Sequence, residues 1–127
     1  MVDFEAYLCK GQDTNILFIE VYHQQMIFLL DNNNNTIRKP SQEELEELKS
    51  IDIGSCEKID RHKIEELGLS FIRLYFVRFE PRIRCAIYRL TIKDVKVYIA
   101  ECYDGSSVTY RYDIFSNLED AMAWIYD

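Results

Sequence analysis

Residues 70–115 read SFIRLYFVRFEPRIRCAIYRLTIKDVKVYIAECYDGSSVTYRYDIF, and this stretch decides the fold. Apolar and polar residues alternate along most of it, which is the period of a β-strand. Pro81 and the pair Asp104-Gly105 interrupt the pattern at positions typical of tight turns. The stretch therefore predicts an antiparallel meander, whose strands are Ser70–Glu80, Ile83–Thr91, Val95–Tyr103 and Ser107–Phe115.

The first of these strands is apolar on both of its predicted faces. One face would carry Ile72, Leu74 and Phe76, and the other Phe71, Tyr75, Val77 and Phe79. A strand that is buried on both faces lies inside a covered sheet. We therefore expect residues 70–79 to lie in the middle of the sheet.

The N-terminal part of the chain predicts further strands. Residues 2–9 alternate with a period of two, which favours a half-buried strand, and a short helix from Asp3 to Gly11 is the competing interpretation. Ile16–Tyr22 and Met26–Leu30 are rich in residues that pack well on a sheet, so they predict a hairpin.

Helices are predicted between and after the strands. The spacing of a capping box occurs at two helix starts, Ser41 with Glu44 and Ser116 with Glu119. A short helix from about residue 59 to Leu67 would end at Gly68 in a left-handed conformation. The whole chain, 1–127, thus predicts a single α+β domain with a largely antiparallel sheet covered by two or three helices.

Composition and cysteine spacing indicate a compartment. No apolar run approaches the roughly 18 residues that cross a bilayer, and the N-terminus lacks the pattern of a signal peptide. Cys9, Cys56, Cys85 and Cys102 are widely spaced, with no Cys-x-x-Cys motif. We therefore interpret them as small buried apolar residues rather than a disulfide framework or zinc site, and we expect a cytoplasmic protein.

The net charge of −7 is unevenly distributed along the chain. Residues 1–60 hold 12 acids and 5 bases, whereas residues 61–127 hold 10 of each. The glutamates of Glu43–Glu47 crowd the first turns of a predicted helix. An acidic surface of this kind repels nucleic acid and anionic lipid and attracts cationic partners.

Catalytic motifs are missing from the sequence. The four glycines do not cluster into a phosphate-binding loop, and no Gly-x-Ser-x-Gly motif occurs. The two histidines and four scattered cysteines form no recognisable nucleophile–base pair or metal cage. We therefore expect a protein that is not an enzyme and holds no cofactor or metal; an enzyme whose site is assembled from distant residues is the alternative.

One segment has the opposite charge. Arg73–Lys96 contains seven bases and two acids, interleaved with tyrosines, as in sheets that bind single-stranded nucleic acid. However, the bases fall on both predicted faces of their strands, and the total charge opposes polyanions. We therefore expect cross-strand pairing with acids, and no nucleic-acid or membrane partner.

Three segments of the sequence support a resemblance to a protein family. They are the acidic helix Glu43–Glu47, the hairpin at Tyr103-Asp104-Gly105, and the closing helix in Phe115–Trp124. In these the chain resembles the small acidic immunity proteins of bacterial contact-dependent and polymorphic toxin systems. The resemblance implies binding to a cognate toxin domain, often a cationic nuclease, and blockage of its active site or substrate groove.

This hypothesis predicts contact residues of two kinds. Charged and amide side chains would meet the partner first, and C-terminal aromatic residues would be a second choice. The predicted set is Glu43, Glu44, Glu46, Glu47, Asp31, Asn32, Asn33, Asn34, Asn35, Trp124 and Tyr126. The alternative functions are a cytoplasmic secretion chaperone or a phage-type inhibitor.

Overall fold

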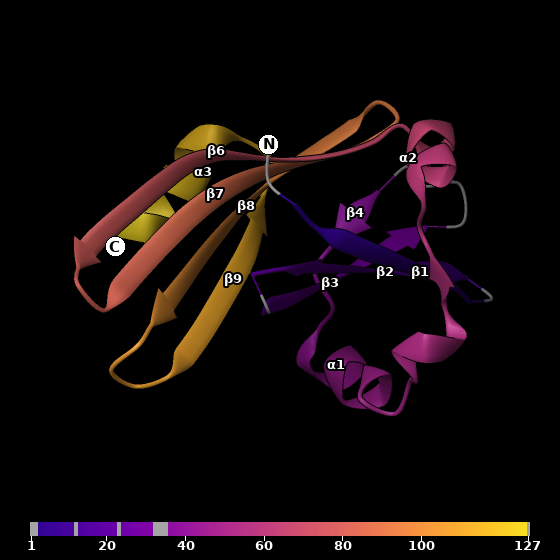
Figure 1. The fold of residues 1–127 in the computed structure, drawn as a ribbon, viewed down its shortest axis with the longest axis horizontal. Helices are drawn as coiled ribbons and strands as arrows, with labels where there is room; N and C mark the ends of the chain where they lie inside the picture. Colours follow the sequence, from indigo (N-terminus) through magenta and orange to yellow (C-terminus); the bar gives the residue numbers. More distant parts are fainter. Residues whose placement is uncertain (1–2, 12, 23, 32–35, 127) are drawn as a thin grey trace. The chain divides into compact units, whose positions relative to one another are not determined.

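The computed structural model describes residues 3–11, 13–22, 24–31 and 36–126. Contacts divide the chain into two compact units, one formed by Asp3–Gly68 and one that begins at Leu69. In the described residues each unit contains one antiparallel sheet, and helices accompany both sheets (Figure 1). The predicted α+β class is therefore confirmed. This division does not test the prediction of a single domain.

The unit Asp3–Gly68 is built on a sheet with the strand order β4-β3-β2-β1-β5. Its strands are β1 (Glu5–Lys10), β2 (Thr14–Val21), β3 (Gln24–Asp31), β4 (Ile37–Arg38) and β5 (Glu57–Lys58). Along β1, Ala6 and Leu8 are buried while Glu5 is exposed, which is the alternation expected of a half-buried strand. The strand interpretation of the N-terminus and the predicted β2–β3 hairpin are thus both confirmed.

The helical segments of this unit are α1 (Gln42–Leu48), the 3₁₀ helix η1 (Ile53–Ser55) and α2 (Arg61–Leu67). The start of α1 and the end of α2 lie at the predicted signals, whereas η1 was not predicted. The side chain of Asp60 accepts a hydrogen bond from the backbone of Lys63 at the start of α2. Gly68 ends α2 with φ of 61°, a left-handed conformation that costs glycine little.

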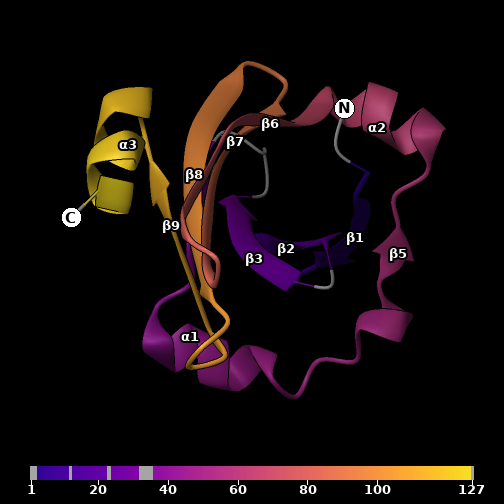
Figure 2. The same ribbon diagram turned by 60° about the vertical axis from the view of Figure 1, so that its left-hand side comes forward.

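The second unit contains the predicted meander, with the strand order β6-β7-β8-β9. Its elements are β6 (Leu69–Glu80), β7 (Ile83–Ile92), β8 (Val95–Asp104), β9 (Thr109–Phe115) and α3 (Leu118–Tyr126). Figure 2 shows α3 lying against one face of this sheet. The helix starts one residue later than predicted: the side-chain oxygen of Asn117, not that of Ser116, accepts a hydrogen bond from the backbone of Asp120, at 2.9 Å.

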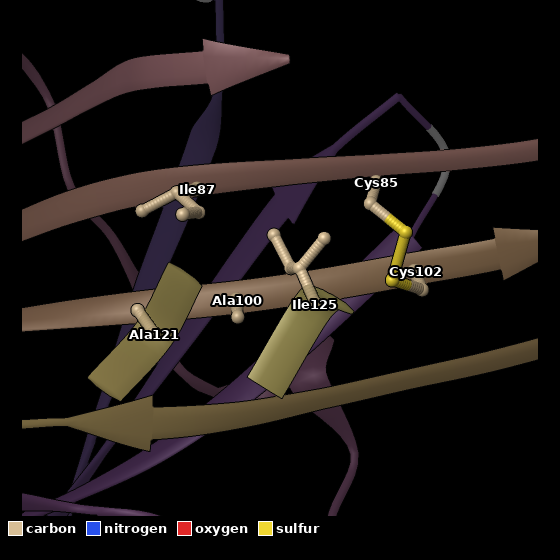
Figure 3. Close-up of a cluster of buried hydrophobic side chains, with 6 residues drawn as sticks. All are labelled: Cys85, Ile87, Ala100, Cys102, Ala121 and Ile125. Carbon is tan, nitrogen blue, oxygen red and sulfur yellow. A yellow bond between two sulfur atoms is a disulfide. The ribbon is translucent and has the colours of Figure 1, made fainter. Parts of the chain in front are cut away.

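A small core lies between α3 and the sheet (Figure 3). Ala121 and Ile125 are the buried residues of α3. They pack on a patch of β7 and β8 that consists of Cys85, Ile87, Ala100 and Cys102. The helical spacing of Ala121 and Ile125 places both side chains on one face, which explains how so short a helix is held.

The strand β6 corrects a prediction. It lies at the edge of its sheet, not in the middle, and pairs with β7 alone. The second half of β6 is exposed: the side chains there, Leu74, Tyr75, Phe76 and Phe79, have exposed fractions of 38–47%. Apolar residues on both faces of a strand occur in a buried central strand and also in an exposed edge strand. The sequence pattern therefore could not distinguish the two positions.

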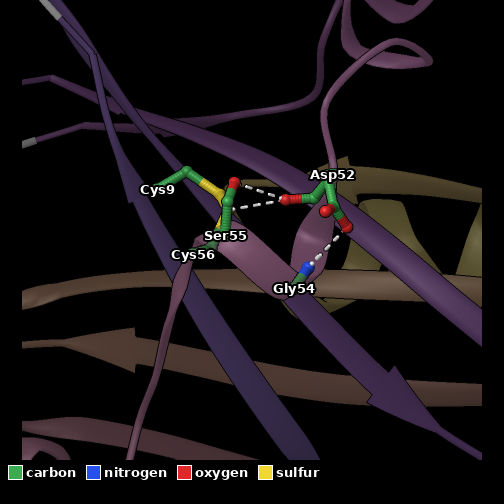
Figure 4. Close-up of a disulfide and its surroundings, with 5 residues drawn as sticks. All are labelled: Cys9, Asp52, Gly54, Ser55 and Cys56. Atoms are coloured by element: carbon green, nitrogen blue, oxygen red, sulfur yellow. Dashed lines mark hydrogen bonds between the residues drawn. A yellow bond between two sulfur atoms is a disulfide. The ribbon is translucent and has the colours of Figure 1, made fainter.

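The cysteines correct a second prediction, because all four are joined in disulfides. Cys9 bonds to Cys56 where β1 passes the end of η1, and Cys85 bonds to Cys102 across β7 and β8. Asp52 caps η1: its side chain accepts a hydrogen bond from the Gly54 backbone at 3.0 Å, and its backbone carbonyl accepts one from the Ser55 hydroxyl at 2.7 Å (Figure 4). Sequence separations of 47 and 17 residues conceal these neighbours until the strands are paired.

Candidate functional site

The helix α1 begins with the predicted capping box. The Ser41 hydroxyl accepts a hydrogen bond from the Glu44 backbone at 3.2 Å, and the Glu44 carboxylate accepts one from the Ser41 backbone at 2.9 Å. No residue of α1 is buried. Its apolar residues Leu45 and Leu48 are half-buried, so the helix lies on the surface and presents its other faces to solvent.

Two of the four clustered glutamates are engaged within the unit. Glu44 forms a two-pronged ion pair with Arg38, with both N–O distances at 2.8 Å. The Arg38 hydrogen bonds hold the pKa of Glu44 down at about 2. Glu46 pairs with Lys49 at 3.0 Å. Glu43 and Glu47 are exposed and remain available to a partner.

A groove lies beside α1. It has a volume of ≈ 520 Å³ and is lined by apolar side chains of β2, β3, α1 and the segment after α1. Its apolar lining consists of Phe18, Ile27, Leu45, Leu48, Ile51 and Ile53. Gln25, Gln42, Lys49 and Asp52 supply polar groups. This combination of an apolar floor with polar borders is what a partner side chain requires for anchoring.

The excess negative charge belongs entirely to the unit that carries α1. The sequence of Asp3–Gly68 holds 14 acids and 7 bases, whereas residues 69–127 hold 8 of each. The acidic helix and its groove therefore lie on a unit with a net charge of −7, and the other unit is neutral as a whole. A field of this sign draws cationic partners toward the first unit.

The other predicted contact residues are distributed over both units. Asp31 is the last residue of β3, opposite Thr14 of β2. Asn32, Asn33, Asn34 and Asn35 lie outside the described residues. Trp124 and Tyr126 belong to α3, in the other unit. The described members of the predicted set are thus divided between the two units.

The two aromatic residues of α3 lie in different surroundings. The Arg111 guanidinium is 4.0 Å from the ring centre of Trp124, a cation–π contact on the sheet face that carries α3. Tyr126 is 55% exposed, and its hydroxyl lies 3.0 Å from that of Tyr75 on β6. The Phe79 ring meets Tyr126 edge-on at 5.4 Å. Tyr126 therefore belongs to an aromatic group that reaches the edge of the sheet.

A hollow of ≈ 370 Å³ adjoins this aromatic group. Phe79, Ile125 and Tyr126 line one part of it, and the residues of the Cys85–Cys102 disulfide line another. Asp104 and Arg111 bring one charge of each sign. The hollow lies wholly within the second unit.

The sheet face away from α3 carries residues that sequence reasoning missed. The Glu101 carboxylate accepts hydrogen bonds from the Tyr88 hydroxyl, at 2.9 Å, and from the Tyr110 hydroxyl. Burial raises the pKa of Glu101, although both hydrogen bonds and the charges of Arg73 and Arg84 act in the opposite direction. With one oxygen engaged by each hydroxyl, this carboxylate serves as a polar anchor between β7, β8 and β9.

Three arginines share this face, Arg73, Arg78 and Arg84, whereas Arg89 and Lys96 lie on the face toward α3, so the bases fall on both faces as expected. Arg73 lies opposite Tyr88, and Arg78 lies opposite Arg84. A β-bulge between Arg73 and Tyr75 brings Arg73 and Arg78 to the same side although their numbers differ in parity. The bulge has no sequence signature that period-two reasoning could detect.

In the described residues, no group of three or more histidine, cysteine or acidic side chains is placed to hold a metal ion. No helix of the described chain has the length and apolar character needed to cross a membrane. Comparison with protein-family models, curated proteins and solved structures finds no match to the chain.

Proposed function

We propose that this chain is a non-catalytic binding protein of the immunity type, which neutralises a basic toxin domain by covering its active site or substrate groove. One observation supports the proposal above the others. An apolar groove borders a helix with exposed Glu43 and Glu47, on the unit that carries the excess negative charge. The proposal includes no catalytic step by this chain and no cofactor.

The two parts of this surface would act at different stages of binding. Exposed carboxylates attract a cationic partner over long range, and their main effect is on the association rate. A desolvated apolar anchor in the groove slows dissociation, because water must re-enter the pocket before the partner leaves. Acidic side chains also resemble the phosphates that a nuclease groove binds, which suits the nuclease class of toxin.

The disulfides bear on where this activity takes place. Cytoplasmic thiols are kept reduced, and disulfides persist mainly in oxidising compartments. The pairing of all four cysteines therefore weighs against the cytoplasmic location predicted from the sequence. Alkylation of free thiols in intact cells, followed by fractionation, decides the compartment and the redox state together.

The test begins with capture and identification of a partner by the purified chain. The proposal expects a basic enzyme whose activity falls to background at equimolar inhibitor. Association is then measured with Glu43→Gln/Glu47→Gln, and with Glu65→Gln on α2 as a matched exposed control. The double variant is expected to associate several-fold more slowly at low salt, with a weaker salt dependence, and the control as fast as the unaltered chain.

The same experiment contains outcomes that would reject the proposal. A captured enzyme that stays active at saturation would exclude neutralisation. Equal association rates for the double variant and the unaltered chain at low salt would remove α1 from the interface. Turnover of a small molecule by the pure protein would favour the enzyme alternative.

A further inference from the structure

The edge strand β6 holds a concentration of exposed apolar side chains. Eight large hydrophobic residues of the described chain are well exposed, and four of them, Leu74, Tyr75, Phe76 and Phe79, lie on this one strand. A fifth, Tyr126, contacts Tyr75 and Phe79. Isolated exposed hydrophobic residues are ordinary, but a contiguous group at an open sheet edge marks an interaction site.

The two sides of this edge differ in chemistry. On the side of α3, Tyr75 and Phe79 join Tyr126 in an aromatic group. On the other side lie Arg73 and Arg78, and the Arg73 guanidinium is 5.2 Å from the ring centre of Phe76. The edge therefore carries aromatic side chains toward α3, and on its other side the two arginines flank Phe76.

Two irregularities limit the length of β6 that could pair regularly with another strand. Register shifts occur between Arg73 and Tyr75 and again between Arg78 and Glu80. Between them, Tyr75–Arg78 pairs regularly with β7 on its inner side. In an antiparallel sheet the backbone groups on the outer side of an edge strand have no ladder partner, so about four residues are prepared to receive another strand.

We propose that β6 accepts, by strand addition, an extended segment of a partner protein in which apolar and acidic residues alternate. Successive side chains of the added strand point to opposite faces. Its apolar residues would then lie beside Tyr75, Phe79 and Tyr126, and its acidic residues beside Arg73 and Arg78. This surface belongs to the neutral unit, whereas the groove beside α1 belongs to the acidic unit.

The charge of β6 favours an acidic segment over a second copy of the chain as the binding partner. In a two-fold antiparallel pairing of two copies through β6, the same face of each sheet would lie on the same side of the joined sheet. The Arg73 and Arg78 side chains of both copies would therefore gather on one face. Like charges on neighbouring strands are destabilising. A segment of alternating acidic and apolar residues instead places negative charges beside the arginines and apolar side chains beside the aromatic group.

The probe is a capped heptapeptide of alternating glutamate and valine, labelled with a dye of zero net charge. Its binding to the full chain is measured by fluorescence anisotropy at low and high salt. The reference peptide has lysine in place of each glutamate. We expect saturable binding of the glutamate peptide that weakens as salt rises, and about tenfold weaker binding of the lysine peptide.

Charge reversal of the edge supplies the decisive comparison. Arg73→Glu/Arg78→Glu is expected to lose the glutamate peptide by about tenfold and to bind the lysine peptide instead. Lys96→Glu, an exposed change on β8 of the same sheet, is expected to bind as the unaltered chain does. Phe79→Ser is expected to weaken both peptides, and circular dichroism confirms that each variant is folded.

Three outcomes would overturn the proposal. One is equal binding of the two peptides by the unaltered chain, and another is an unchanged preference in the double reversal. The third is a concentration-dependent dimer that Phe79→Ser dissociates and the glutamate peptide does not, because that result assigns the edge to a second copy.

Discussion

Truncation of Ile125 to alanine tests how α3 is held and what it protects. The helix has nine residues, too few for stability in isolation, and it is anchored by the buried Ala121 and Ile125. Ile125 is only 5% exposed and packs on the residues of the Cys85–Cys102 disulfide. Removing most of a buried aliphatic side chain costs about 3 kcal/mol.

That cost has a specific consequence, because α3 covers a disulfide (Figure 3). A thiol reductant reaches Cys85 and Cys102 when the helix opens. If the full cost falls on this opening, the open population rises about 100-fold, since about 1.4 kcal/mol corresponds to a factor of ten. Reduction of this disulfide should accelerate by the same factor when closing is faster than chemical attack.

The assay compares two disulfides in one sample. Protein is treated with a reductant, quenched with an alkylating agent at intervals, and analysed by peptide mass spectrometry. In Ile125→Ala we expect faster labelling of Cys85 and Cys102, with the labelling of Cys9 and Cys56 unchanged because that disulfide lies in the other unit.

The control replaces an exposed residue of the same helix. Ala123→Ser should leave both reduction rates near those of the unaltered chain. Equal acceleration of the two disulfides in Ile125→Ala would indicate global unfolding rather than opening of α3. No acceleration of Cys85–Cys102 would refute the inference that the helix limits its access.

Two further predictions concern pH. The pKa of Glu44 is about 2, below its usual 4.5. The interactions of its carboxylate therefore stabilise α1 above pH 4.5, and this stabilisation is lost as the pH falls toward 2. In Arg38→Ala, the helix content measured by circular dichroism should depend less on pH between 4.5 and 2. The pKa of Glu101 is raised, so its contribution is greatest below 4.5 and is lost as the pH rises through the raised value. The difference in urea stability between the unaltered chain and Glu101→Gln should change over that rise, and a constant difference would contradict the assignment.

Local signals predicted much of the fold. The alternation in residues 83–104, the turn at Asp104-Gly105 and the capping box at Ser41 each depend on a few neighbouring residues. Gly68 likewise ends α2 as its position indicates. Such features are readable because the physical cause lies within about one turn or one hairpin of the residue concerned.

The pairing of distant segments could not be predicted in the same way. Cys9 and Cys56 become neighbours only after β5 pairs with β1, and Cys85 meets Cys102 only in one register of the β7–β8 hairpin. A shift by one residue would place Cys85 and Cys102 on opposite faces. The charge of α1 was readable from the sequence, whereas the engagement of Glu44 by Arg38 required the placement of β4 beside the helix.

The bulge in β6 explains why the most informative surface of the second unit was misread. Strict alternation places Phe71 and Tyr75 on one face, but the structure pairs Phe71 opposite Leu90 and Tyr75 opposite Ile87, which lie on opposite faces of β7. The inserted residue exchanges the faces of Tyr75–Arg78, up to the second register shift. Arg78 thereby joins Arg73, and Tyr75 turns toward α3. The first bulge thus places both arginines on one side of the edge and Tyr75 on the other, and the alternating partner segment that we propose follows from that arrangement.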